Sequence, residues 1–291
     1  MGLIKKVDGL LRRASPGLHA KLKNLYRGYK KRTNPTLSQV ELRSILISDL
    51  AIKQGDVVFV HSSMRNLYCD FDKSAILGIL MEVVGREGTL AFPCWQFNIR
   101  AEDYIRDHDI VFDIRNSPSA MGKIPDTLRL RKDAFRSFHP TNSIVAIGKH
   151  ARDLTQGHDT DIYPCGFSSP FYKLIDLDAK IIGLGVTVSS LTFVHTVEDT
   201  IKDEFPLKTR STTVYPCKCL DEQGLERIVN TLVAAPAIAH RDVEGFFRLH
   251  VPGEIYRNVK FKDMDFFGLD ARAIYQTLKK LALDNKTIYS Y

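Results

Sequence analysis

The chain has 291 residues, of which 44% are hydrophobic and 26% are charged, and its formal net charge is +7. This composition is typical of a folded globular protein and excludes a largely disordered chain. No apolar run approaches the roughly 20 residues that a membrane-spanning helix needs, and the N-terminus lacks the continuous apolar stretch of a secretory signal. We therefore expect a cytoplasmic protein.

The positive charge is concentrated at the N-terminus. Residues 1–35 carry ten Lys or Arg residues and one acidic residue, which leaves residues 36–291 with a net charge of about −2. Apolar residues in this arm follow helical spacing, with basic residues between them. The pattern favours equally a solvated arm or packing helix and an arm that lies on the anionic inner face of a membrane or docks on a partner. Nucleic-acid binding ranks last, because no aromatic and basic recognition motif accompanies the arm.

Helices alternate with short apolar strands from residue 36 onward. Ser38 and Glu41 have the spacing of a capping box, and the helix that they open is predicted to end at Gly55. A final helix is predicted from an Asp270 cap to about Leu281. Between them, helices are predicted over 73–84 and 121–131, and strands over 57–60, 89–92, 144–147 and 180–184.

Apolar strands separated by helices predict an α/β fold, in which a mixed, partly parallel sheet is covered by helices on both faces. Residues 211–233 break this pattern with two β-rich runs around 221–224, so we expect a β-rich insertion over about residues 207–235. We therefore predict a basic arm over residues 1–35 and a single domain over residues 36–291. Ligands of such folds bind at the carboxyl ends of the strands.

The five cysteines are scattered and include no Cys-x-x-Cys pair, which argues against a disulfide framework and against a four-cysteine zinc site. Cys217 and Cys219 point the same way in a predicted strand, but they would need further ligands to bind a metal. We therefore expect no metal site.

The strongest chemical feature is the segment 192–198, which follows the predicted strand at 180–184 and opens a helix. His195 and Glu198 are three residues apart and share one helix face, with Thr192 three residues further back. An imidazole accepts a proton near neutral pH, and a neighbouring carboxylate fixes its tautomer and raises its basicity. An exposed helical pair is the ordinary alternative for this spacing. The surrounding segments are therefore needed to distinguish a catalytic pair from a surface pair.

Two further polar segments offer groups that bind phosphate. The first closes the strand at 57–60 and contains His61, Ser62, Ser63, Met64 and Arg65. The second opens a helix after a long loop, and its candidates are Ser117, Ser119, Gly122 and Lys123. Both offer hydroxyls, backbone N–H groups and a cation, which together suit a phosphate. A polar turn is the structural alternative for each.

In their order along the chain, these segments resemble the aminoglycoside 3-N-acetyltransferase family. The family pattern contains His-Ser-Ser, Gly-Thr-Leu, Ser-Pro-Ser-x-Met-Gly, Ser-x-His-Pro, Gly-His with Gly-x-x-Ser-Pro, and Thr-x-x-His-x-x-Glu. The matching positions are 61–63, 88–90, 117–122, 137–140, 157–158 with 166–170, and 192–198. Ala120 and Asn142 stand where the family commonly has Arg and His. The resemblance covers about residues 36–285 and implies an α/β fold distinct from that of the GCN5-related acetyltransferases.

The resemblance implies that an acetyl group passes from acetyl-CoA to the amino group of an amino sugar. It implies His195 as general base, Glu198 as the group that orients it, and Thr192 with backbone N–H groups as donors to the oxyanion. It places the phosphates of acetyl-CoA on the two polar segments, and the amino sugar beside Trp95 and His139. For His139, a structural hydrogen-bonding role is the alternative. Because no cysteine lies in a matched motif, we expect direct transfer without an acetyl-enzyme.

The acceptor is the harder question. Aminoglycosides are polycations, whereas this chain is basic and its body nearly neutral. We therefore expect a nucleotide-linked amino sugar, a precursor of surface polysaccharides, whose enzymes would use the basic arm near a membrane. An aminoglycoside, and hence antibiotic resistance, is the alternative. A catalytically silent protein that binds coenzyme A or a partner is the alternative from another class. The sequence predicts no oligomeric state.

Overall fold

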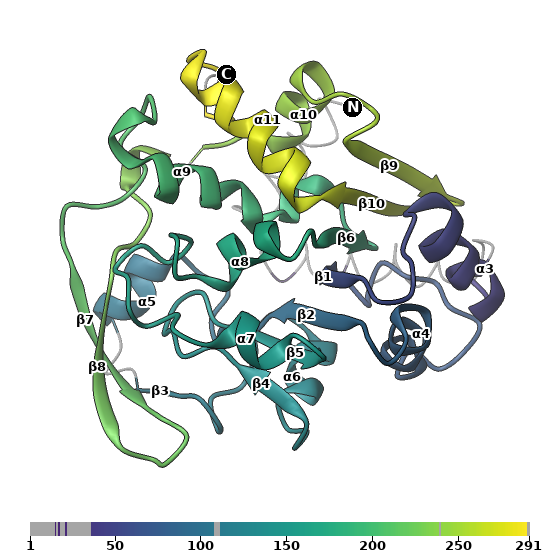
Figure 1. Ribbon diagram of the computed structural model, residues 1–291, viewed down its shortest axis with the longest axis horizontal. Coiled ribbons are helices and arrows are strands. Elements are labelled where there is room, and N and C mark those ends of the chain that lie inside the picture. Colours follow the sequence, from purple (N-terminus) through teal and green to yellow (C-terminus); the bar gives the residue numbers. More distant parts are fainter. Residues whose placement is uncertain are drawn as a thin grey trace.

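The computed structural model describes residues 36–107, 111–238 and 240–289, together with residues 15, 17 and 21. Its centre is a seven-stranded sheet in the order β4-β5-β2-β1-β6-β10-β9 (Figure 1). Its strands are β1 (Val57–Ser62), β2 (Thr89–Pro93), β4 (Ala134–Arg136), β5 (Ile144–Gly148), β6 (Lys180–Leu184), β9 (Tyr256–Phe261) and β10 (Met264–Asp270). β1 is parallel to β2 and β6, and the outer strands pair antiparallel. The predicted mixed, partly parallel sheet is confirmed.

Helices cover both faces of this sheet, as predicted. One face carries α3 (Gln39–Ser44), α4 (Ala75–Val84) and α6 (Lys123–Leu128). The other carries α7 (Ala151–Thr155), α8 (Pro170–Asp176), α9 (His195–Ile201), α10 (Val243–His250) and α11 (Ala271–Leu283). A further short helix, α5 (Ala101–Asp107), lies near the β-rich insertion (Figure 1).

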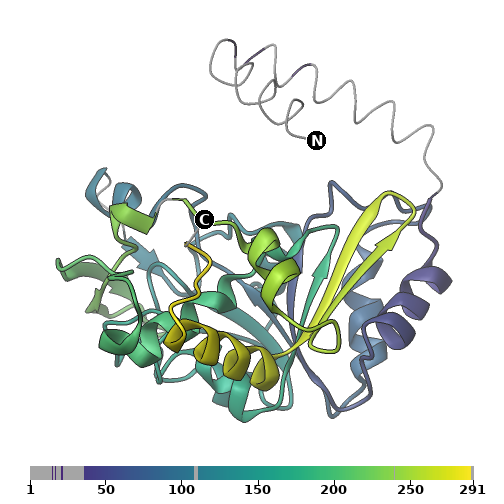
Figure 2. The same ribbon diagram turned by 90° about the horizontal axis from the view of Figure 1, so that it is seen from above.

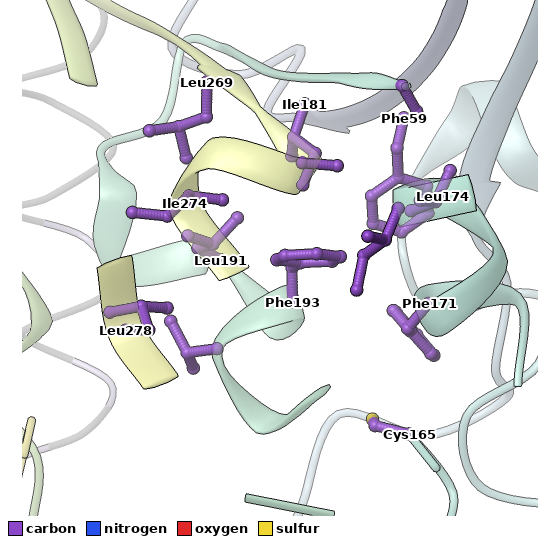
Figure 3. Close-up of a cluster of buried hydrophobic side chains, with 14 of the residues drawn as sticks. Phe59, Cys165, Phe171, Leu174, Ile181, Leu191, Phe193, Leu269, Ile274 and Leu278 are labelled. Carbon is purple, nitrogen blue, oxygen red and sulfur yellow. The ribbon is translucent and has the colours of Figure 1, made fainter. Parts of the chain in front are cut away.

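Two hydrophobic clusters sandwich the sheet. Along β1, Val57 and Phe59 belong to one cluster, and Val58 and Val60 belong to the other, because successive side chains of a strand point to opposite faces. In the first cluster the ring of Phe59 meets that of Phe171 edge-on at 5.7 Å (Figure 3). Strands that are buried on both faces have continuous apolar runs in their sequences. The central strands were predictable for that reason.

The β-rich insertion forms a second sheet of three strands. β7 (Tyr215–Leu220) and β8 (Glu226–Thr231) pair antiparallel, as expected of a hairpin. In the turn between them, the side chain of Asp221 accepts two backbone N–H groups. β3 (Val111–Asp113), which the sequence did not predict, joins β7 in parallel. The hairpin therefore pairs with a segment of the long loop that follows β2.

The first helix ends earlier than predicted. The capping box is present, because Ser38 and Glu41 exchange hydrogen bonds of 2.8 and 3.2 Å. The helix then continues through a π-helical segment only as far as Asp49. Ala51 has a left-handed backbone with φ of 54°, which turns the chain towards β1 before Gly55 is reached.

Two other helices differ from their approximate predicted bounds. The helix predicted over 121–131 covers only Lys123–Leu128. The last helix runs two residues past its predicted end, to Leu283. Asp270 occupies the N-cap position of that helix, but its side chain makes no capping bond and instead accepts a hydrogen bond of 2.7 Å from Lys180.

The basic arm over residues 1–35 lies outside the described residues, apart from positions 15, 17 and 21. Its expected contact with a membrane surface therefore stays a prediction. In the described part of the chain, no helix combines the length and the apolar character that crossing a membrane requires.

Candidate active site

The predicted base and its carboxylate lie at the carboxyl edge of the central sheet. β1 and β6 are parallel neighbours, and His61 in β1 pairs with Gly183 in β6. The chain leaves β6 through two short 3₁₀ helices, Val188–Ser190 and Thr192–Val194, and enters α9 at His195. The two motifs are 130-odd residues apart in sequence but share one end of the sheet (Figure 1).

His195 and Glu198 are in direct contact, as their spacing predicts. The Nδ1 atom of His195 lies 2.9 Å from Oε2 of Glu198. The carboxyl side chain of Glu198 is only 2% exposed, whereas the imidazole of His195 is 15% exposed. Thr192 is half-buried in the 3₁₀ helix that precedes them. The pair is therefore a buried carboxylate behind an accessible imidazole, and not an exposed surface pair.

Two further residues, not predicted from the sequence, contact this pair. Tyr289 donates a hydrogen bond of 2.7 Å from its hydroxyl to Oε1 of Glu198. Arg241 donates from its guanidinium to Nε2 of His195, also at 2.7 Å. Tyr289 lies 91 positions from Glu198 and Arg241 lies 46 positions from His195 along the chain, so no local sequence spacing predicts these contacts.

These contacts fix the protonation pattern of the pair. Burial alone would raise the pKa of Glu198, but His195, Arg210 and the hydroxyl of Tyr289 outweigh it, so the pKa lies below the usual 4.5. An ionised carboxylate only accepts hydrogen bonds, so it holds the imidazole proton on Nδ1. Nε2 is then an acceptor, which agrees with the guanidinium donor that faces it and with the atom a general base needs.

The residue after the carboxylate anchors the helix. Asp199 is fully buried and makes two hydrogen bonds with Arg210, of 2.6 and 2.7 Å. The backbone N–H of Cys165 donates to the same carboxylate at 2.8 Å. Paired oxygens and nitrogens in this fork geometry are specific as well as strong. Asp199 therefore ties α9 to two loops and fixes the direction in which His195 points.

The first predicted phosphate segment lies at the carboxyl ends of β1 and β6. His61 is buried, its Nε2 has no partner among the described residues, and burial lowers its pKa to about 4. The loop that follows is tied to the end of β6, since the N–H of Ser63 donates to Leu184 at 2.9 Å. Ser62, Ser63 and Met64 are half-buried, and Arg65 is exposed. The segment thus presents polar groups at the same edge as His195.

Two serines of the second predicted segment make hydrogen bonds within their own turn. Ser117 is buried and its hydroxyl accepts the N–H of Asp113 at 2.8 Å, so its contact with a phosphate stays a prediction. Ser119 is half-buried, while Gly122 and Lys123 are exposed. These three keep surface that a ligand can reach.

His139 lies inside the fold, and its Nε2 has no hydrogen-bond partner among the described residues. Its side chain is fully buried, stacks on His158 at 4.3 Å, and accepts the N–H of Asn142 at 3.1 Å. Nδ1 thus has the structural hydrogen bonds of the alternative, and the contact of His139 with substrate stays a prediction. Trp95 is half-buried and packs against the cluster that contains Phe59, so its indole keeps some exposed surface.

Among the described residues, no three His, Cys, Asp or Glu side chains gather closely enough to hold a metal ion. Cys217 and Cys219 lie buried in β7, where burial raises the pKa of their thiols to about 11 and about 12. Thiols of this kind are protonated at neutral pH and pack as small hydrophobic side chains.

A cavity of about 580 Å³ opens beside the buried carboxylate. The ionisable residues in its lining are Glu198, Asp203, Lys202, Lys208 and Arg210. Both signs of charge are present in similar number, so the cavity by itself selects neither a cationic nor an anionic acceptor.

The family model described as aminoglycoside 3-N-acetyltransferase matches residues 59–282. The chain belongs to this family. Among curated relatives, aminoglycoside N(3)-acetyltransferase IX of Micromonospora chalcea is 32% identical over 169 residues, which is 52% of this chain and 58% of the relative. Aminoglycoside N(3)-acetyltransferase VII of Streptomyces paromomycinus is 30% identical over 58% of this chain and 62% of the relative. Each match spans less than two thirds of the relative's length.

Solved structures share the fold. Aminoglycoside acetyltransferase AAC(3)-Xa superposes with a TM-score of 0.72 at 21% identity, over 91% of this chain and 98% of that one. AAC-IIIb in a binary complex with CoASH has a TM-score of 0.69 at 19% identity, over 88% and 100% of the two chains. AAC-VIa bound to sisomicin has a TM-score of 0.68 at 21% identity, over 87% and 100%.

These comparisons contradict one expectation from the sequence. A nucleotide-linked amino sugar was expected as acceptor, but the family model and both curated relatives are aminoglycoside acetyltransferases. They favour the stated alternative. The expectation rested on net charge, which is about +9 for residues 1–35 and about −2 for residues 36–291, and net charge does not describe the charges that line a binding site.

Proposed function

We propose that this chain transfers the acetyl group of acetyl-CoA to an amino group of an aminoglycoside. The observation that carries the proposal is the buried Glu198 behind His195, which leaves Nε2 as a proton acceptor at the sheet edge. Membership of the family supports the acceptor class. The solved relatives with CoASH and with sisomicin support the two substrates.

The residues present suit the deprotonation that this reaction needs. An ammonium group has no lone pair, so Nε2 of His195 removes one proton before the amine attacks the thioester carbonyl. Glu198 stabilises the imidazolium that forms. As the tetrahedral intermediate collapses, the amine nitrogen releases its second excess proton to solvent, and the imidazolium protonates the departing thiolate. Arg241 has to leave Nε2 before the acceptor amine reaches it, because both need the same lone pair.

Acetyl-CoA supplies the activated acetyl group as a thioester. We propose that Thr192 and neighbouring backbone N–H groups donate to the acetyl oxygen as negative charge develops there. The phosphates would lie on the loop from His61 to Arg65 and near Ser119 to Lys123. Arg65 and Lys123 are the exposed cations of these two segments, and cations with N–H groups stabilise phosphate.

Thiol release from acetyl-CoA tests the proposal. The purified full chain is offered a panel of aminoglycosides, including sisomicin and gentamicin, and in parallel a panel of nucleotide-linked amino sugars. We expect thiol release that depends on the aminoglycoside panel. Turnover with nucleotide-linked sugars alone would overturn the acceptor class, and silence with both panels would overturn the catalytic proposal in favour of a binding protein.

A further inference from the structure

The last described residues of the chain reach back into the active site. α11 ends at Leu283, and Asn285 adopts a left-handed backbone with φ of 58°. The N–H of Lys286 donates to Leu281 at 2.8 Å and that of Asn285 to Ala282 at 2.9 Å. These two bonds with a left-handed residue form the Schellman motif that commonly ends a helix. Figure 2 shows the chain turning sharply there.

The segment after this turn is held in place by packing and by the backbone. Thr287 and Ile288 are buried, and Ile288 belongs to the same hydrophobic cluster as Phe59. The carbonyl of Ile288 accepts the N–H of Asp242 at 2.9 Å. Asp242 directly follows Arg241, so one backbone bond links this segment to the loop that carries the guanidinium facing His195.

This anchored segment therefore places Tyr289 beside Glu198. Glu198 has two oxygens, of which one faces Nδ1 of His195 and the other accepts the hydroxyl of Tyr289. Burial and the adjacent carboxylate raise the pKa of Tyr289, so the phenol stays a donor. A buried carboxylate with both oxygens engaged cannot rotate freely, and its orientation sets the orientation of the imidazole.

We infer that Tyr289 is a positioning residue for acetyl transfer, which acts by holding Glu198 in line with His195. The inference rests on the proposed function. The family model ends at residue 282, so this role falls on a segment that the family match does not cover. The hydroxyl of Tyr289 donates to a charged acceptor, the carboxylate of Glu198. Losing a hydrogen bond to a charged group costs about tenfold to a hundredfold in an equilibrium or a rate.

The test is the substitution Tyr289→Phe, which removes only the hydroxyl. We expect kcat for acetyl transfer to fall by about tenfold or more, with the KM for acetyl-CoA changed less than about twofold. Tyr275→Phe is the matched control, because the hydroxyl of Tyr275 pairs with Thr200 on α9 at 3.0 Å without touching the carboxylate. We expect that control to retain wild-type kcat.

A double-mutant cycle separates positioning from a merely structural role. If Tyr289 acts through Glu198, Tyr289→Phe has little further effect in a Glu198→Gln background, because groups that act as one unit are not additive. An equal loss of kcat in both backgrounds would overturn the inference. So would a Tyr289→Phe variant with wild-type kcat.

A spectroscopic measurement tests the positioning contact independently of catalytic turnover. The Nδ1–H proton of His195 is followed by NMR in the full chain, and we expect Tyr289→Phe to shift or broaden its resonance while Tyr275→Phe leaves it unchanged. An unchanged resonance in Tyr289→Phe would contradict the inference. An inactive wild-type protein with the expected NMR change would defeat the proposed function and leave the positioning contact standing.

Discussion

Replacing His195 with alanine lowers kcat/KM for acetyl transfer by about a hundredfold to ten-thousandfold, the range that a positioned general base contributes. The loss arises because no other group in the described part of the site accepts a proton from the acceptor amine while backed by a buried carboxylate. Acetyl-CoA binding, measured by calorimetry, stays close to wild type, because the imidazole acts on the amine.

His150→Ala serves as the matched control for that substitution. His150 follows β5, whose end pairs with the beginning of β2, so it lies at the sheet edge opposite to His195. We expect the control to keep wild-type kcat/KM. If His195→Ala keeps more than a tenth of wild-type activity, or if it loses acetyl-CoA binding in proportion to activity, the assigned role is wrong.

Replacing Arg210 with leucine destabilises the fold by about 3–5 kcal/mol, because the carboxylate of Asp199 stays buried without its cation. Both of its bonds to Arg210 are lost, and only the N–H of Cys165 remains. Urea denaturation measures this change as a lower free energy of unfolding. Since Asp199 anchors α9, the variant should also lose acetyl transfer at temperatures where it is still folded.

The exposed pair of Arg131 and Asp133 supplies the control. Its atoms are 2.7 Å apart, but the two side chains are 42% and 58% exposed. Water screens such a pair, so Arg131→Leu should change the free energy of unfolding by less than about 1 kcal/mol. Equal losses in Arg210→Leu and Arg131→Leu would show that the buried pair does not anchor the helix.

The central part of the fold was predictable because its strands are buried on both faces. β1, β2, β5 and β6 are continuous apolar runs, and each was predicted within about two residues of its observed limits. The antiparallel pair β9 and β10 was missed. β9 is an edge strand whose residues alternate between half-buried and exposed, with Arg257, Asn258 and Lys260 among them, and so it lacks an apolar run.

The active site was predictable only where it is local in sequence. His195 and Glu198 belong to one helix, so their three-residue spacing sufficed to pair them. Tyr289 and Arg241 reach the same two side chains from segments that tertiary packing brings together. The burial of His139 and Ser117 was not predictable for a related reason, because the polarity of a residue in the sequence does not reveal its burial in the fold.

Identification of the product tests the central claim most directly. The full chain is incubated with acetyl-CoA and sisomicin, and the antibiotic is examined by mass spectrometry and NMR. We expect a sisomicin that carries one acetyl group on a single amine, the 3-amino group, with an equal amount of coenzyme A released. Sisomicin recovered unmodified, or acetylated at a hydroxyl group, would contradict the proposal that this chain is an aminoglycoside N-acetyltransferase.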